Sequence, residues 1–226
     1  LSRVQDLRVI SRTSVERYRD SQASVPEIGR RLGVNHVLEG SVQRIGQRLR
    51  VNAQLVEVAT DTHLWVDVLD GELADVFEIQ SQIAQHVAAS IGATLRPTEV
   101  QAMTQVPTTD ASAYQAYLQA RDELRRDGTG RASLFRSQAL LDRAVAEDPD
   151  FALAQATLAR VHTFTHWFGY DTDPRRLQQA SDALDAALGA DPNLAEAHLA
   201  LGLYRAAGFR DYIGALAAYQ QAELRQ

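Results

Sequence analysis

The chain has 226 residues and a net charge of −6, with 45% apolar and 23% charged residues. This composition is typical of globular proteins and excludes a disordered chain, and the acidic balance argues against nucleic acid as a partner of this segment. The absence of cysteine and lysine excludes disulfides, thiol nucleophiles, Schiff-base chemistry and the lysine of a phosphate-binding loop.

Both ends of the sequence lack the usual boundary signals. The only methionine is Met103, and Gln226 falls inside an amphipathic helical pattern that no glycine or proline closes. We therefore expect a segment of a longer protein, whose effector domain lies elsewhere. No apolar run is long enough to span a bilayer, so no membrane span is expected in this segment. The compartment stays open between the cytoplasm and, for a membrane-anchored parent, the periplasm.

The composition changes near Pro97. Residues 1–97 contain 14 Val and 6 Ile against 8 Ala, whereas residues 98–226 contain 4 Val and 1 Ile against 27 Ala. Val and Ile favour strands and Ala favours helices. The predicted fold class is therefore α+β: a small mixed α/β module over residues 1–97, a linker over 98–110 and an all-helical part over 111–226.

The first part predicts alternating strands and helices. Residues 7–11 indicate a short strand, and residues 25–32 a helix that Pro26 begins and Gly33 ends. Alternating apolar residues predict strands at 36–45 and 48–58 with a hairpin turn at Gly46, and a third strand at 63–69. A helix over 74–95 follows, with one apolar stripe that packs on the sheet: Val76, Ile79, Ile83, Val87 and Ile91.

Three blocks of this first part carry a resemblance. They read VISRTSV, then IGRRLGVNHVLEGSVQRIGQRLRVNAQLVEVATDTHLWVDVLD, then ADVFEIQSQIAQHVA. Together they resemble the bacterial domain called TolB amino-terminal-like or FlgO-like over nearly all of residues 1–95. The resemblance implies a parent with a winged-helix, class III cyclase or Ser/Thr kinase effector domain, and it implies no catalytic residues. It also implies a strand and a helix before Leu1, without which an open sheet edge would invite self-association.

Internal repeats organise the second part. Ala144, Ala187 and Ala222 align, with small residues seven positions earlier, bulky residues three positions earlier, and prolines five positions after the first two. This pattern resembles helix B of the tetratricopeptide repeat and predicts about three repeats, the last truncated. The middle repeat has an insertion, expected as a loop over 167–173. The residues expected to pack the repeats are Ala144, Pro149, Ala180, Ala187, Pro192, Gly202, Ala215 and Ala222.

The repeat resemblance implies a concave surface, lined by the first helix of each repeat, that binds a protein or peptide. Aromatic residues around the insertion are open to two interpretations, as packing or as a binding hot spot: Phe164, Trp167, Phe168 and Tyr170. The residues expected to line the partner-binding groove are Leu153, Ala156, Arg160, Thr163, Phe164, Trp167, Glu196, Leu199 and Leu203.

No motif for catalysis, a metal or a cofactor emerges. His162 and His166 have the spacing of a metal pair but lack a third ligand, which favours packing or groove roles. Ser14 and Ser41 lie outside any nucleophile elbow. The predicted function is therefore a non-catalytic regulatory segment that binds a protein or peptide. Two alternatives stay open: the regulatory region of a nucleotide cyclase or kinase, and a small-ligand sensor module.

Overall fold

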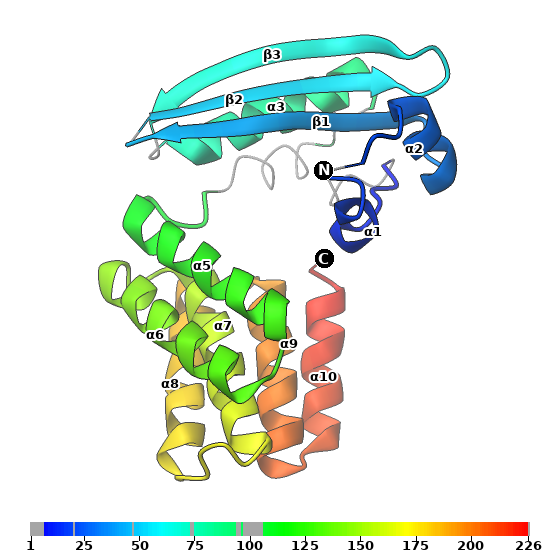
Figure 1. The fold of residues 1–226 in the computed structure, drawn as a ribbon. Helices are drawn as coiled ribbons and strands as arrows, with labels where there is room; N and C mark the ends of the chain where they lie inside the picture. The colour runs from blue at the N-terminus through cyan, green and yellow to red at the C-terminus, as the bar shows by residue number, and fades with distance from the viewer. Residues whose placement is uncertain are drawn as a thin grey trace. The chain divides into compact units, whose positions relative to one another are not determined.

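The structure is a computed structural model that describes residues 7–19, 21–46, 48–72, 75–93, 96 and 106–225. The chain divides into two compact units, Leu1–Val106 and Pro107–Gln226. The described part of the first unit holds a three-stranded sheet with helices, and that of the second holds helices alone, which fits the α+β class (Figure 1).

The sheet of the first unit is an antiparallel meander in the order β1-β2-β3. Strand β1 covers His36–Ile45, β2 covers Arg48–Glu57 and β3 covers Thr62–Glu72. The predicted hairpin is confirmed, and Gly46 at its turn has a φ of 63°. The third strand extends beyond the predicted 63–69 at both ends, because Thr62 and Glu72 still pair with Glu57 and Arg48 of β2.

Two helices of the first unit follow their sequence signals. Helix α2 (Val25–Leu32) begins with a capping box between Ser24 and Glu27, and it ends at Gly33 in the left-handed conformation. Helix α3 (Val76–Ser90) lies against one face of the sheet (Figure 1). Its buried residues join buried side chains of β2 in a core: Leu49, Leu55, Val56, Ile79 and Val87. The helix ends before the predicted boundary at residue 95, because Gly92 turns the chain at a φ of 67°.

The strand predicted at 7–11 is wrong. Residues 7–11 have no regular structure, and helix α1 (Arg12–Glu16) follows them directly. An extended segment becomes a strand only when another strand pairs with its backbone groups. Among the described residues, the sheet consists of β1, β2 and β3 alone, so this segment has no pairing partner there.

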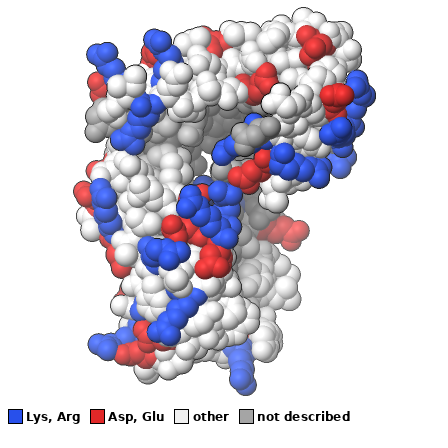
Figure 2. Space-filling view, viewed as in Figure 1, with Lys and Arg blue, Asp and Glu red and all other residues white. Residues whose placement is uncertain are grey.

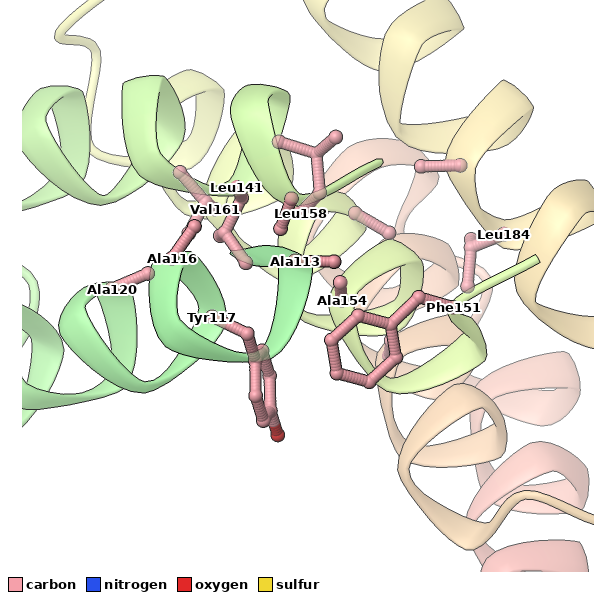
Figure 3. Packing of buried hydrophobic residues seen from close by; sticks show 14 of the residues in the cluster. Ala113, Ala116, Tyr117, Ala120, Leu141, Phe151, Ala154, Leu158, Val161 and Leu184 are labelled. Atoms are coloured by element: carbon pink, nitrogen blue, oxygen red, sulfur yellow. The ribbon is translucent and has the colours of Figure 1, made fainter. Parts of the chain in front are cut away.

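The second unit is built from helices that pack in consecutive pairs (Figure 1). Helices α5 (Ala111–Asp127) and α6 (Arg131–Glu147) form the first pair, and α7 (Ala152–Trp167) and α8 (Arg175–Ala190) form the second. Helix α9 (Ala195–Leu203) continues into a π-helical turn, η2 (Tyr204–Gly208), and pairs with α10 (Tyr212–Glu223). Figure 3 shows the core where the first two pairs meet, with Tyr117, Leu141, Phe151 and Leu158 around small alanines.

Small residues lie where the helices approach most closely. Ala144, Ala180, Ala187 and Ala222 are fully buried, and Ala215 is nearly so. A β-carbon on Gly202 would overlap the ring of Tyr219, so any larger residue there would force that ring to move. Pro149 and Pro192 are exposed and stand two residues after the ends of α6 and α8. The helices thus pair around small side chains, while their assignment to tetratricopeptide repeats stays a prediction.

Two predicted boundaries need correction. Most of the linker predicted at 98–110 lies outside the described residues, but its last residues belong to the second unit: the buried Thr108 donates a hydrogen bond to Asp148. Asp110 caps α5 by accepting a hydrogen bond from the Ala113 backbone N–H at 2.7 Å. The loop predicted at 167–173 begins one residue later, because α7 continues through Trp167.

Candidate partner-binding surface of the second unit

Tyr117 of α5 lies in a buried core to which α7 and α9 also contribute. The centroid of its ring lies 5.0 Å from that of Phe151, which directly precedes α7. Burial raises the pKa of Tyr117; the Arg121 guanidinium opposes this shift and the Glu196 carboxylate adds to it. Tyr117 of α5, Leu158 of α7 and Ala200 of α9 belong to one buried core, which these three helices share.

The residues predicted to line the groove divide by exposure. Arg160, Trp167 and Leu199 are exposed, with Trp167 at 56% and Leu199 at 38%. Four others are partly buried: Leu153, Phe164, Glu196 and Leu203. These seven can present at least part of their side chains to a partner.

Ala156 and Thr163 do not belong to the accessible set, and their prediction as groove residues is wrong. Both are buried, at 0% and 1% exposure. The Thr163 hydroxyl donates within its own helix, to the Ala159 carbonyl at 2.8 Å. The reason is that α7 packs against α6, α8 and α9, so most of its circumference is covered. Sequence periodicity does not reveal how many neighbours a helix has.

The aromatic cluster has one packed side and one open side. The ring centroids of Phe164 and Trp167 are 6.2 Å apart, those of Trp167 and Phe168 5.3 Å, and those of Phe168 and Tyr170 5.9 Å. Phe164 and Tyr170 pack against the hydrophobic core, whereas Trp167 and Phe168 are 56% and 43% exposed. Large exposed aromatic side chains that are held in place by packing are typical of binding hot spots.

A partly buried polar network connects three helices of the second unit. Arg176 of α8 donates to the Asp171 carboxylate at 2.8 Å and to the Gln138 side chain at 2.7 Å, and its guanidinium lies 3.0 Å from Nδ1 of His162. Because a guanidinium only donates, Nδ1 of His162 accepts and the imidazole proton sits on Nε2. Burial, together with the charge of Arg176, lowers the pKa of His162 to about 4. This network joins α6, α7 and α8.

The network explains His162 and was not visible in the sequence. His162 is 3% exposed and lies beside the Arg176 guanidinium; among the described residues no group of three or more His, Asp or Glu side chains could hold a metal ion. Nothing in the sequence singled out Arg176, because the neighbouring Arg175 has the same side chain. The two arginines differ only in the direction in which each side chain leaves the helix: the Arg176 side chain is 11% exposed and that of Arg175 is 86% exposed.

The first unit contains a cavity that the sequence did not predict. It is open, has a volume of about 1280 Å³, and is bordered by residues 7–10, α1, α2, α3 and the sheet. Gly40 of β1 and Ala53 of β2 face each other in the strand register, and Asp67 follows on β3. A β-carbon on Gly40 would overlap the backbone of Asn52, so this glycine permits the close approach of β1 and β2. Ala53 contributes only a methyl group to the cavity wall.

Charged side chains are interspersed on the face of the protein that Figure 2 shows. Arginines alternate there with acidic residues. Within the described residues, no helix combines the length and the apolar character needed to cross a bilayer.

Comparisons with known proteins connect both units to one longer protein. No family model matches the chain. Over 206 residues, 90% of this chain, it is 30% identical to "Putative adenylate cyclase 3" of Rhizobium meliloti (strain 1021). The match covers 34% of that protein, so the chain spans about a third of its relative.

Proposed function

We propose that this chain is a non-catalytic regulatory segment of a longer adenylate cyclase-type signalling protein, and that it binds a protein or peptide through α5, α7 and α9. One observation carries the proposal: the match to a third of a protein named as an adenylate cyclase extends over both units. A region of that size beside an effector domain is suited to regulation. The supporting observation is that exposed side chains of α7 and α9 lie on a framework of packed helices.

The test measures whether substitutions in the second unit change the cyclase activity of the full-length protein. Ala187→Arg forces a cation into the buried contact between helix pairs, whereas Ala190→Arg, at the exposed end of α8, is the matched control. We expect the full-length protein to form cyclic AMP from ATP, and Ala187→Arg to change that rate several-fold while Ala190→Arg leaves it unchanged. A full-length protein that forms no cyclic AMP, or an Ala187→Arg rate equal to wild type, would contradict the proposal.

A second candidate function is a small-ligand sensor in the first unit, which the cavity of about 1280 Å³ favours. A ligand at 100 times its Kd stabilises a folded protein by about 2.7 kcal/mol. A thermal-shift screen of metabolites should therefore find a stabilising compound, and Ala53→Leu, which adds bulk at the cavity wall, should remove that shift. A shift that Ala53→Leu leaves intact would place the ligand elsewhere.

A further inference from the structure

The C-terminal half of α7 presents a row of side chains along one face. We call Arg160, Phe164, Trp167 and Phe168 the α7 stripe. Their spacings of four, three and one residues keep them on one side of a helix. Arg160 is exposed, and so are the large apolar side chains of Trp167, the last residue of α7, and of Phe168, its C-cap. The stripe therefore combines one cation with an aromatic surface.

The guanidinium of Arg160 is free to pair with an anion. Among the described residues, no carboxylate lies within ion-pair distance of it, whereas other arginines of this unit have such partners: Arg126 binds Asp122, Arg136 binds Glu123 and Arg176 binds Asp171. A guanidinium offers two parallel N–H donors to a carboxylate, which gives a stronger and more directional pair than a lysine would.

A second exposed arginine lies on the first helix of the preceding pair. Arg160 follows the fully buried Ala159, and Arg121 follows the fully buried Ala120, whose carbonyl accepts a hydrogen bond from Ser137 of the paired helix. Arg121 is also exposed and has no carboxylate within ion-pair distance among the described residues; its guanidinium lies over the ring of Tyr117. The two arginines place positive charge on both α5 and α7.

The aromatic end of the stripe supplies an apolar anchor at a defined spacing. Trp167 and Phe168 stack at 5.3 Å, and Phe164 fixes them from the buried side, at 6.2 and 5.8 Å. Seven residues of α7 separate Arg160 from Trp167, or about 10 Å at 1.5 Å per residue. An extended peptide advances about 3.3 Å per residue. A carboxylate and an apolar side chain three residues apart would therefore reach both ends of the stripe.

We propose that the α7 stripe binds an acidic peptide segment in which a carboxylate precedes a large apolar side chain by three residues. Arg160 pairs with the carboxylate, Trp167 and Phe168 hold the apolar side chain, and Arg121 extends the positive charge toward α5. This inference rests on the proposed function and names the chemistry of its partner.

The experiment measures fluorescence anisotropy of a labelled octapeptide, Gly-Asp-Glu-Asp-Ser-Phe-Leu-Gly, titrated with the chain. One comparison peptide replaces the acids by lysine, and another replaces Phe and Leu by serine. We expect the acidic aromatic peptide to bind at least tenfold more tightly than either. Arg160→Glu and Trp167→Ala should each weaken its binding at least tenfold. The matched controls are Arg126→Glu and Leu118→Ala, which should leave binding unchanged. In the wild type the Arg126 side chain is 66% exposed and Leu118 is 41% exposed.

Equal or tighter binding of the lysine peptide would overturn the assignment of an acidic partner. The absence of binding by all three peptides, or an Arg160→Glu variant that binds like wild type while circular dichroism shows it folded, would overturn the site. The two proposals fail separately. If Ala187→Arg changes the cyclase rate but the acidic peptide does not bind, the regulatory function stands and the α7 stripe loses its role.

Discussion

Arg176 links three helices of the second unit. Its guanidinium is 11% exposed and satisfies acceptors on Asp171, Gln138 and His162. Because the Asp171 side chain is 32% exposed, water compensates part of the loss of its partner, so the cost is smaller than for a fully buried ion pair. We expect Arg176→Met to lower the free energy of unfolding by about 1–2 kcal/mol, as measured by urea denaturation.

The neighbouring arginine provides the control for this prediction. Arg175 is 86% exposed and pairs with Asp173 on the surface, where an ion pair contributes about 0–1 kcal/mol. Arg175→Met should therefore shift the unfolding midpoint only slightly. Equal losses in the two variants would mean that the buried network does not stabilise the fold.

His162 makes stability depend on pH. Its pKa falls from the ordinary value of 6.5 to about 4, because burial and Arg176 both disfavour the imidazolium. Between these values the unfolded chain binds the proton and the folded chain does not, so stability falls as the pH drops from about 6.5 toward 4. At 1.36 kcal/mol per pKa unit, about 3 kcal/mol is lost over this range.

The pH effect can be separated from the titration of carboxylates by substitution. His162→Gln removes the titrating group, so the difference in unfolding free energy between pH 7.5 and pH 4.5 should be about 2–3 kcal/mol smaller in this variant than in the wild type. Chemical denaturation at the two pH values measures it. Parallel pH profiles for the two proteins would show that His162 keeps its ordinary pKa.

At the level of helices, small side chains set how closely the pairs approach. Ala187 is fully buried and packs with Ala152, Ala156, Leu194 and Ala197. Ala187→Arg overpacks this contact and buries an unpaired charge, so we expect a loss of about 3 kcal/mol or more, seen as a lower Tm. Ala190→Arg, on the exposed end of the same helix, should melt within a few degrees of wild type. A normal Tm for Ala187→Arg would contradict the predicted repeat register.

The strand β1 is an edge of the described sheet and carries exposed apolar side chains. Val42 is 67% exposed and Leu38 is 42% exposed, on the face where α3 covers β2 and β3. Unpaired edge groups beside apolar side chains favour pairing with a second copy. We expect sedimentation to show concentration-dependent dimers that Val42→Lys weakens. Val68→Lys, on β3, is the control, and equal effects of the two substitutions would argue against association through β1.

At the level of the whole molecule, each unit has its own core. Leu55, Val56, Ile79 and Val87 are buried in the first unit, and a separate cluster around Phe151 fills the second. We expect residues 107–226 produced alone to be helical and to unfold with the urea midpoint of the corresponding transition in the full chain. An unfolded fragment would show that the second unit depends on the first.

The local signals were sufficient for most elements of both units. The hairpin at Gly46, the helix that Ser24 and Glu27 cap, and the buried alanines follow from turn preference, capping and helix contact, each of which acts within a few residues. Arg160, Trp167 and Leu199 are exposed, and their place in a partner-binding groove stays a prediction.

Only the tertiary structure decided the features that depend on distant neighbours. Residues 7–11 have strand-like composition but no pairing partner among the described strands, and Ala156 and Thr163 are covered because α7 has neighbours on several sides. Arg176 differs from Arg175 only in the direction of its side chain. That direction brings it to Gln138 of α6, which is 38 residues away in the sequence. Backbone pairing, burial and buried charge networks are properties of assembled elements, and the cavity of the first unit arises in the same way, from the packing of helices around a sheet.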